Sequence, residues 1–206
     1  MKSLLLLLFS AGLSYGQTVR TIYFDSRGEV TRASRASFYC VITRQETDTT
    51  LYTTESFYAS RTRKARGSYR AQTFPVSWEQ LPASHFRDAF PEGTHQTYYE
   101  NGQLQFEGDF LKGRGAGPHR RWYENGTLLS DMTLANGRSE GTSSSYHPNG
   151  QLKMQVSYRN GLPHGDLTEY DERGKKKSRV RMENGVPTGK MVRYDEQEQA
   201  LPDAQP

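Results

Sequence analysis

The chain has 206 residues, with 27 lysines and arginines against 23 aspartates and glutamates, which gives a net charge of +4 when the histidines are neutral. This length suits one domain, and the low mean hydropathy argues against a thick two-layer core and for a repetitive single sheet, which buries less surface per residue. Cys40 is the only cysteine, so an intrachain disulfide is excluded.

Residues 1–16 have the features of a secretion signal. Lys2 precedes an apolar run from Leu4 to Leu13 that is too short to span a bilayer, and small residues stand at the two positions that favour cleavage before Gln17. We therefore expect cleavage near Gly16–Gln17 and a secreted or periplasmic, cell-envelope location. A buried strand or a retained anchor is the alternative. Export makes nucleic acid a poor candidate as a partner.

Residues 17–90 are rich in strand-forming residues but show no regular period, and we interpret them as degenerate repeats that cap the sheet. The segment Phe57–Tyr69 aligns without a gap with Tyr98–Phe110, although Arg61 replaces the turn glycine. Thr21–Val30 resembles half a repeat. Divergence is expected in a terminal unit, because it must shield the last apolar column from water.

Three local features of this region carry predictions of their own. Gln45–Thr50 is interpreted as a polar hairpin loop, and Val76–Phe86 is the one place for a short helix, unless it is plain connection. Cys40 lies in the strand-like run Phe38–Ile42 and is expected to be buried and inert, with an intermolecular bridge as the alternative.

From Pro91 to residue 198, glycine recurs every 24 residues in three columns. The first column is Gly102, Gly126, Gly150 and Gly174, the second is Gly113, Gly137, Gly161 and Gly185, and the third is Gly93, Gly117, Gly141, Gly165 and Gly189. Asparagine precedes most glycines of the first two columns, and Asn-Gly favours type I′ hairpin turns, in which both central residues need positive φ. Two turns per period imply two strands per repeat. The third column closes segments that hold Pro163 and Pro187, which we assign to loops because proline lacks a backbone N–H.

Apolar residues alternate with polar ones between the turns, as expected for strands. Leu152, Met154, Val156 and Tyr158 are predicted to share one face of the sheet with the aromatic column Tyr98, Trp122, Tyr146 and Tyr170. The predicted fold is all-β: an elongated single antiparallel meander sheet of stacked ~24-residue β-hairpin repeats over residues 91–198. The degenerate N-terminal β cap precedes it, and a disordered tail at 199–206 follows it.

One aromatic column is predicted to face the other side of the sheet. Tyr99, Tyr123 and His147 alternate with the buried aromatics, and stacked exposed rings bind sugars, peptides or proteins. We therefore take these three residues as a candidate binding surface. Cross-strand pairing that stiffens the sheet is the alternative.

A basic patch is the second candidate surface. It consists of Lys175, Lys176, Lys177, Arg179 and Arg181. Such a patch attracts anionic envelope polymers or lipid headgroups, so peripheral membrane contact is one interpretation. The simpler interpretation is a solvated strand whose cations guard a sheet edge.

No catalytic or metal site is predicted. None of the five histidines pairs with another histidine or cysteine at zinc-ligand spacing, and the glycine loops lack the Lys-Ser/Thr and the helix of a phosphate motif. The turn carboxylates Glu100 and Glu124 would stand about 10 Å apart, beyond the separation of a glycosidase pair. We therefore expect no enzyme activity and no cofactor.

The motifs YYENGQL (98–104), WYENGTL (122–128) and YHPNGQL (146–152), with the Asn-Gly-x-Pro-x-Gly linkers, resemble the MORN-repeat variant of bacterial proteins. Many such proteins carry the label YwqK-type antitoxin. The resemblance covers about residues 91–195. It implies an elongated sheet of stacked hairpins and a binding or scaffold role without catalytic residues.

Together these observations predict a non-enzymatic, exported repeat protein, a monomer that binds a protein or an envelope component. An antitoxin or immunity protein that neutralises a toxin and a module that binds anionic lipid are the alternatives.

Overall fold

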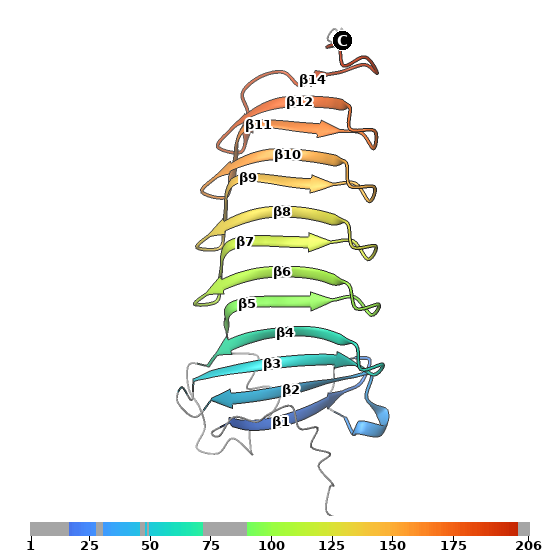
Figure 1. The fold of residues 1–206 in the computed structure, drawn as a ribbon. Coiled ribbons are helices and arrows are strands. Elements are labelled where there is room, and N and C mark those ends of the chain that lie inside the picture. Colours follow the sequence, from blue (N-terminus) through green and yellow to red (C-terminus); the bar gives the residue numbers. More distant parts are fainter. Residues whose placement is uncertain (1–16, 28–30, 46–47, 49, 72–89, 202–206) are drawn as a thin grey trace, which may run out of the picture.

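The computed structural model describes residues 17–27, 31–45, 48, 50–71 and 90–201 (Figure 1). The predicted signal, the short helix predicted at Val76–Phe86 and residues 202–206 of the predicted tail lie outside this part of the chain. In the part described, the only helical element is a single 3-10 turn at Ala33–Arg35, and no helix there is long and apolar enough to cross a membrane.

The strands run back and forth in chain order and form one antiparallel sheet. They are β1 (Gln17–Phe24), β2 (Phe38–Gln45), β3 (Leu51–Tyr58), β4 (Arg63–Arg70), β5 (Phe90–Tyr98), β6 (Leu104–Leu111), β7 (Arg114–Trp122), β8 (Leu128–Ala135), β9 (Arg138–Tyr146), β10 (Leu152–Arg159), β11 (Leu162–Tyr170), β12 (Lys176–Glu183), β13 (Val186–Pro187) and β14 (Val192–Arg193). Figure 1 shows the hairpins stacked in one elongated column, which confirms the predicted all-β meander.

The turns of the second glycine column are of type I′, as predicted. Asn136 and Gly137 have φ angles of 51° and 79°, and Asn160, Asn184 and their following glycines repeat this pair of left-handed residues. Both central residues of a type I′ turn require positive φ, which asparagine and glycine adopt at the lowest cost.

The turns of the first glycine column are different, and the type I′ prediction is wrong there. In the turn after β7 only Gly126 has a positive φ, of 85°. Its N–H donates to the carbonyl of Tyr123, and the Tyr123 N–H donates to the carbonyl of Thr127. This is a type I turn followed by a left-handed glycine. Asn125 stays out of the left-handed region and accepts the Thr127 N–H through Oδ1.

Each first-column turn is followed by a β-bulge that the alternation of apolar residues does not reveal. In the β9–β10 hairpin, Tyr146 pairs with Leu152, but the register shifts before Met154. The extra residue turns Leu152 to the face opposite Met154 and Val156. The prediction that Leu152 shares a face with these residues is therefore wrong, and the aromatic column and the Leu column lie on the other face. Corresponding shifts occur before Tyr98, Trp122 and Tyr170.

The third glycine column marks a second bulge, inside the odd-numbered strands. Pro163 lies within β11, opposite Tyr158, and the register shifts between Tyr158 and Val156 at the level of Gly165, whose φ is 112°. The assignment of Pro163 to a loop is therefore wrong, as is that of Pro187, which lies in β13. Next to a bulge the missing proline N–H costs little, and the Pro163 carbonyl still accepts the Gly185 N–H.

The two faces of the sheet differ in burial. We call the face with Tyr146 and Leu152 the open face, and the face with Val156 and Val180 the packed face. Val156 is 1% exposed and Val180 is 7% exposed. At the N-terminal end of the sheet, four buried side chains form a hydrophobic cluster: Ile22, Ile42, Tyr52 and Ala71.

Aromatic rings continue the packed face from this cluster into the array. Tyr52 stacks on Tyr69 with ring centroids 5.8 Å apart, and Tyr69 meets the edge of His95 at 4.7 Å. Phe110 then lies between His95 and His119, 5.1 Å from each. This continuous series of rings packs the N-terminal region directly onto the first repeats.

The turn of the β3–β4 hairpin has the geometry of a first-column turn. Arg61 adopts a φ of 68° at the position of the turn glycine, and its N–H donates to the Tyr58 carbonyl as the glycine N–H does in the array. This turn geometry agrees with the predicted alignment of Phe57–Tyr69 with Tyr98–Phe110. Gly28 and Val30 of the other proposed half repeat lie outside the described residues.

The sheet thins at its C-terminal end. β13 and β14 have two residues each and both pair with β12. Glu198 takes the left-handed turn position with a φ of 59°, and Ala200 bridges Tyr194. Residues 199–201, which we expected to belong to a disordered tail, therefore continue the hydrogen bonding of the sheet edge.

Cys40 lies in β2 beside the N-terminal cluster and is half-buried rather than fully buried. Burial raises the pKa of its thiol, while a hydrogen bond with Ser56 acts in the opposite direction. A raised pKa leaves less thiolate at neutral pH, which fits the inert cysteine expected from the sequence.

Candidate binding surface

A hydrogen-bond ladder joins each hairpin to the next through the predicted Tyr99 column. The hydroxyl of Tyr99 donates to the carbonyl of Trp122 at 2.8 Å, and that of Tyr123 donates to the carbonyl of Tyr146 at 2.8 Å. His147 continues the ladder, with Nε2 3.1 Å from the carbonyl oxygen of Tyr170. In each case the acceptor lies 23 residues further along the chain.

The same ladder reaches back into the N-terminal region, where the hydroxyl of Tyr58 donates to the carbonyl of Tyr98 at 3.1 Å. Tyr99, Tyr123 and His147 are half-buried between hairpins, and their polar atoms bind the array itself. These contacts give the column a structural role. Its use as a contact surface stays a prediction.

The turn asparagines form a second ladder parallel to the first. The side-chain amides of Asn101, Asn125 and Asn149 donate to the carbonyls of Glu124, Pro148 and Glu172, each 23 residues ahead. In the turn after β11 the position of the asparagine is taken by Arg173. There the Asp171 carboxylate accepts the N–H groups of Arg173 and Lys175. These backbone hydrogen bonds lower the pKa of the Asp171 carboxyl.

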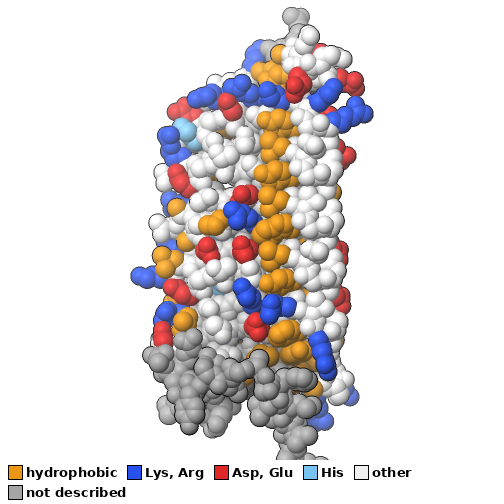
Figure 2. Space-filling view, in the orientation of Figure 1, with side chains coloured by type: hydrophobic (Ala, Val, Ile, Leu, Met, Phe, Trp, Pro, Cys, Tyr) orange, Lys and Arg blue, Asp and Glu red, His pale blue; other side chains and the backbone are white. Residues whose placement is uncertain are grey.

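The open face carries a continuous apolar row along the molecule. The paired strand ends supply it: Tyr98 with Leu104, Trp122 with Leu128, Tyr146 with Leu152, and Tyr170. All seven side chains are half-buried, and Figure 2 shows a band of hydrophobic side chains beside the turn edge. An apolar band of this length on an uncovered face is typical of an interaction surface.

The charge of the side chains next to the apolar row changes from negative to positive along the array. In the first repeat Asp109 binds Thr94 at 2.6 Å and Glu107 binds Gln96, so neither carboxylate is paired with a cation in the described part of the chain. The second repeat adds the ion pair between Arg120 and Asp131, at 3.3 Å. The first half of the open face is therefore acidic.

At the other end of the open face the charge is positive. Asp166 of β11 binds Arg179 of β12 at 2.7 Å and lies 3.7 Å from Arg181. The hydrogen bond to Asp166 raises the pKa of the Arg179 guanidinium, which keeps it charged at all relevant pH values. Lys176 has no ion-pair partner among the described residues.

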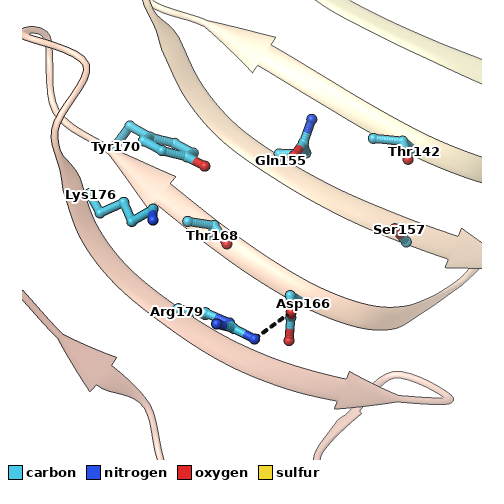
Figure 3. A pocket seen from close by; sticks show the side chains of 8 residues that line it. All are labelled: Thr142, Gln155, Ser157, Asp166, Thr168, Tyr170, Lys176 and Arg179. Atoms are coloured by element: carbon cyan, nitrogen blue, oxygen red, sulfur yellow. Dashed lines mark hydrogen bonds and ion pairs between the residues drawn. The ribbon is translucent and has the colours of Figure 1, made fainter. Parts of the chain in front are cut away.

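A shallow depression of about 400 Å³ lies on this basic end (Figure 3). It is lined by Thr142, Gln155, Ser157, Asp166, Thr168, Tyr170, Lys176 and Arg179. Figure 3 shows these side chains on the same face of β9 to β12, with the Asp166–Arg179 ion pair at one side and Lys176 beside the Tyr170 ring.

The predicted basic patch is thus divided. Lys176 and Arg179 line the depression and Arg181 shares Asp166 with Arg179, whereas Lys175 and Lys177 are exposed but do not line it. The sequence alone could not make this division, because the bulge before Tyr170 decides which lysine shares a face with the arginines.

Among the described residues, no group of three or more His, Cys, Asp or Glu side chains is placed to hold a metal ion. His95 and His119 lie one period apart, but each ring contacts a backbone carbonyl, of Ser68 at 2.6 Å and of Asp109 at 2.9 Å. They are packing residues of the packed face.

Two hairpins of the array match a known repeat family. Residues 91–112 and 139–160 match the MORN repeat variant. Each MORN match spans one odd strand, one first-column turn and one even strand, and the two matches lie two periods apart. MORN repeats are repeat modules that in general bind proteins or membranes. No curated protein matches the chain.

Proposed function

We propose that this protein is a non-enzymatic, exported binding scaffold that uses the open face of its MORN array to hold a protein or an envelope component. The observation that carries the proposal is the apolar row from Tyr98 to Tyr170, which lies uncovered beside polar side chains of both signs. Mixed apolar and charged surfaces of this kind suit specific recognition. The leader-like segment 1–16 supports export.

Binding through the open face is tested by capture on the immobilised mature chain. Envelope extract of the source organism is passed over the wild type, a Leu128→Ser variant and a Leu111→Ser variant. Leu111 is 56% exposed and lies outside the row, so it controls for the loss of any surface leucine. We expect Leu128→Ser to lower the captured amount of a specific component and Leu111→Ser to leave it unchanged. Equal capture by all three proteins would contradict binding through the open face.

Export is tested separately. The full chain is produced in a bacterial host, and the N-terminus of the protein recovered outside the cytoplasm is sequenced. We expect Gln17 as the first residue. Recovery of uncleaved protein from the cytoplasm alone would contradict export without affecting the binding proposal.

A further inference from the structure

The depression at the basic end of the open face has the composition of a ligand site. Thr142, Ser157, Thr168 and Gln155 present three hydroxyls and one amide, groups that both donate and accept hydrogen bonds. Tyr170 adds a flat ring at the edge, and Lys176 and Arg179 add two cations. These side chains converge from four neighbouring strands.

The cations of the site exceed its carboxylates. The lining holds two cations, Lys176 and Arg179, against one carboxylate, Asp166. Asp166 also lies within ion-pair distance of Arg181, so one carboxylate serves two guanidinium groups. The Lys176 ammonium forms no ion pair among the described residues, although the Lys176 backbone N–H donates to Oε1 of Glu198 at 2.9 Å, so this cation is available to attract an anion.

The corresponding positions two periods earlier have the opposite charge. There Leu128 takes the place of Lys176 and Asp131 that of Arg179, while Glu107 and Asp109 take the places of Gln155 and Ser157. That region holds three carboxylates against Arg120 alone. The same backbone thus presents an acidic surface at one end and a basic one at the other, so the basic character of the depression does not follow from the fold.

We propose that the depression binds an anionic polysaccharide whose sugar units carry carboxylate groups. This inference rests on the proposed binding function and names the ligand class of one part of the open face. The apolar C–H face of a sugar ring packs against Tyr170, sugar hydroxyls replace water on the threonine, serine and glutamine side chains, and a carboxylate meets Lys176 and Arg179.

A polysaccharide fits the site better than an acidic peptide does. An extended peptide binds a sheet through the backbone groups of an exposed edge strand, and the depression lies on the face of the sheet, where the backbone groups of β10 and β11 are paired. Uncommitted hydroxyl and amide groups beside an aromatic ring suit a ligand that is rich in hydroxyls.

The test is isothermal titration calorimetry of the mature chain with tetragalacturonate, a carboxylated tetrasaccharide. Maltotetraose serves as the neutral sugar and tetraglutamate as the acidic peptide. We expect binding of tetragalacturonate that weakens as salt rises, and affinity for the two other probes at least about tenfold lower. Lys176→Gln should weaken binding of tetragalacturonate about tenfold, whereas Lys177→Gln, the same charge change at the next residue, should alter it less than about twofold.

Two further measurements keep the outcome unambiguous. Circular dichroism checks that each variant is folded, and Tyr170→Phe, which keeps the ring, should bind as the wild type while Tyr170→Leu binds more weakly. Equal losses in Lys176→Gln and Lys177→Gln, or tetraglutamate binding as tightly as tetragalacturonate, would overturn the proposal. So would stronger binding to phosphatidylglycerol vesicles than to the sugar. If envelope capture depends on Leu128 but tetragalacturonate does not bind, the ligand class is wrong and the scaffold function stands.

Discussion

Replacement of Gly126 by valine isolates the backbone contribution of one turn. Gly126 has a φ of 85°, and a Cβ there would meet only the Oε1 end of Gln103, at 3.4 Å. That flexible side chain can move, so the cost is the left-handed backbone itself. An L-residue in this region costs about 1–2 kcal/mol, and a β-branched one is disfavoured further, so we expect about 2–3 kcal/mol for Gly126→Val.

Thermal unfolding measures this cost. A chain of this size loses about 2–4 °C of Tm per kcal/mol, so Gly126→Val should melt about 4–12 °C below the wild type. The signals are circular dichroism of the strands and tryptophan fluorescence, to which Trp122 at the end of β7 contributes together with Trp78. Coincident curves from the two probes would justify a two-state treatment.

Gly126→Asn is the matched control at the same position. Asparagine adopts positive φ in this chain at Asn136, Asn160 and Asn184, so Gly126→Asn should lose less than half of what Gly126→Val loses. If valine and asparagine melt together within about 1 °C of the wild type, the backbone argument for the first-column turn is refuted.

Three further predictions concern contacts that hold the repeats together. Tyr123→Phe removes the hydroxyl that binds the next hairpin and should cost about 1 kcal/mol in urea unfolding; no change would deny that ladder any stabilising role. Gly108→Ala should cost about 1–3 kcal/mol, because its Cβ would lie 2.5 Å from the Nδ1 atom of His119, and the His119→Ser change should recover part of this loss if that clash is the cause. Burial lowers the pKa of His95 below its usual 6.5, so the folded state resists its protonation; stability present above pH 6.5 should fall as the pH drops toward 5, and less so in His95→Gln, as melting curves would show.

Much of the fold follows from glycine alone. The period places two turns in every repeat, and neighbouring hairpins must then pair, because an isolated hairpin buries too little apolar surface to be stable. The glycines of both turn columns were therefore predictable as positive-φ positions, whereas the asparagines before the first-column glycines, such as Asn125, were wrongly expected to share that conformation.

The assignment of side chains to faces was not predictable from alternation, because one extra residue reverses it. Leu152 and Met154 have the same parity in the sequence but lie on opposite faces. The bulge is seen only in the ladder itself, where the register of β7 and β8 shifts between Arg121 and Trp122. The partners of Tyr99 and Tyr123 were missed for a related reason, since a hydrogen bond to a backbone carbonyl leaves no trace in residue type.

The repeat columns of this chain divide into constant and variable ones. The turn glycines keep their residue type from repeat to repeat, and the asparagines of the second ladder do so in the first three repeats. The open-face column of Glu107, Asp131, Gln155 and Arg179 passes from acid through amide to base, although all four residues occupy equivalent places in β6, β8, β10 and β12. A solvent-facing position on a fixed backbone can change charge at little cost in stability. The sign of the open face can therefore vary independently of the fold, and a partner that distinguishes the two ends of the array must do so through these side chains.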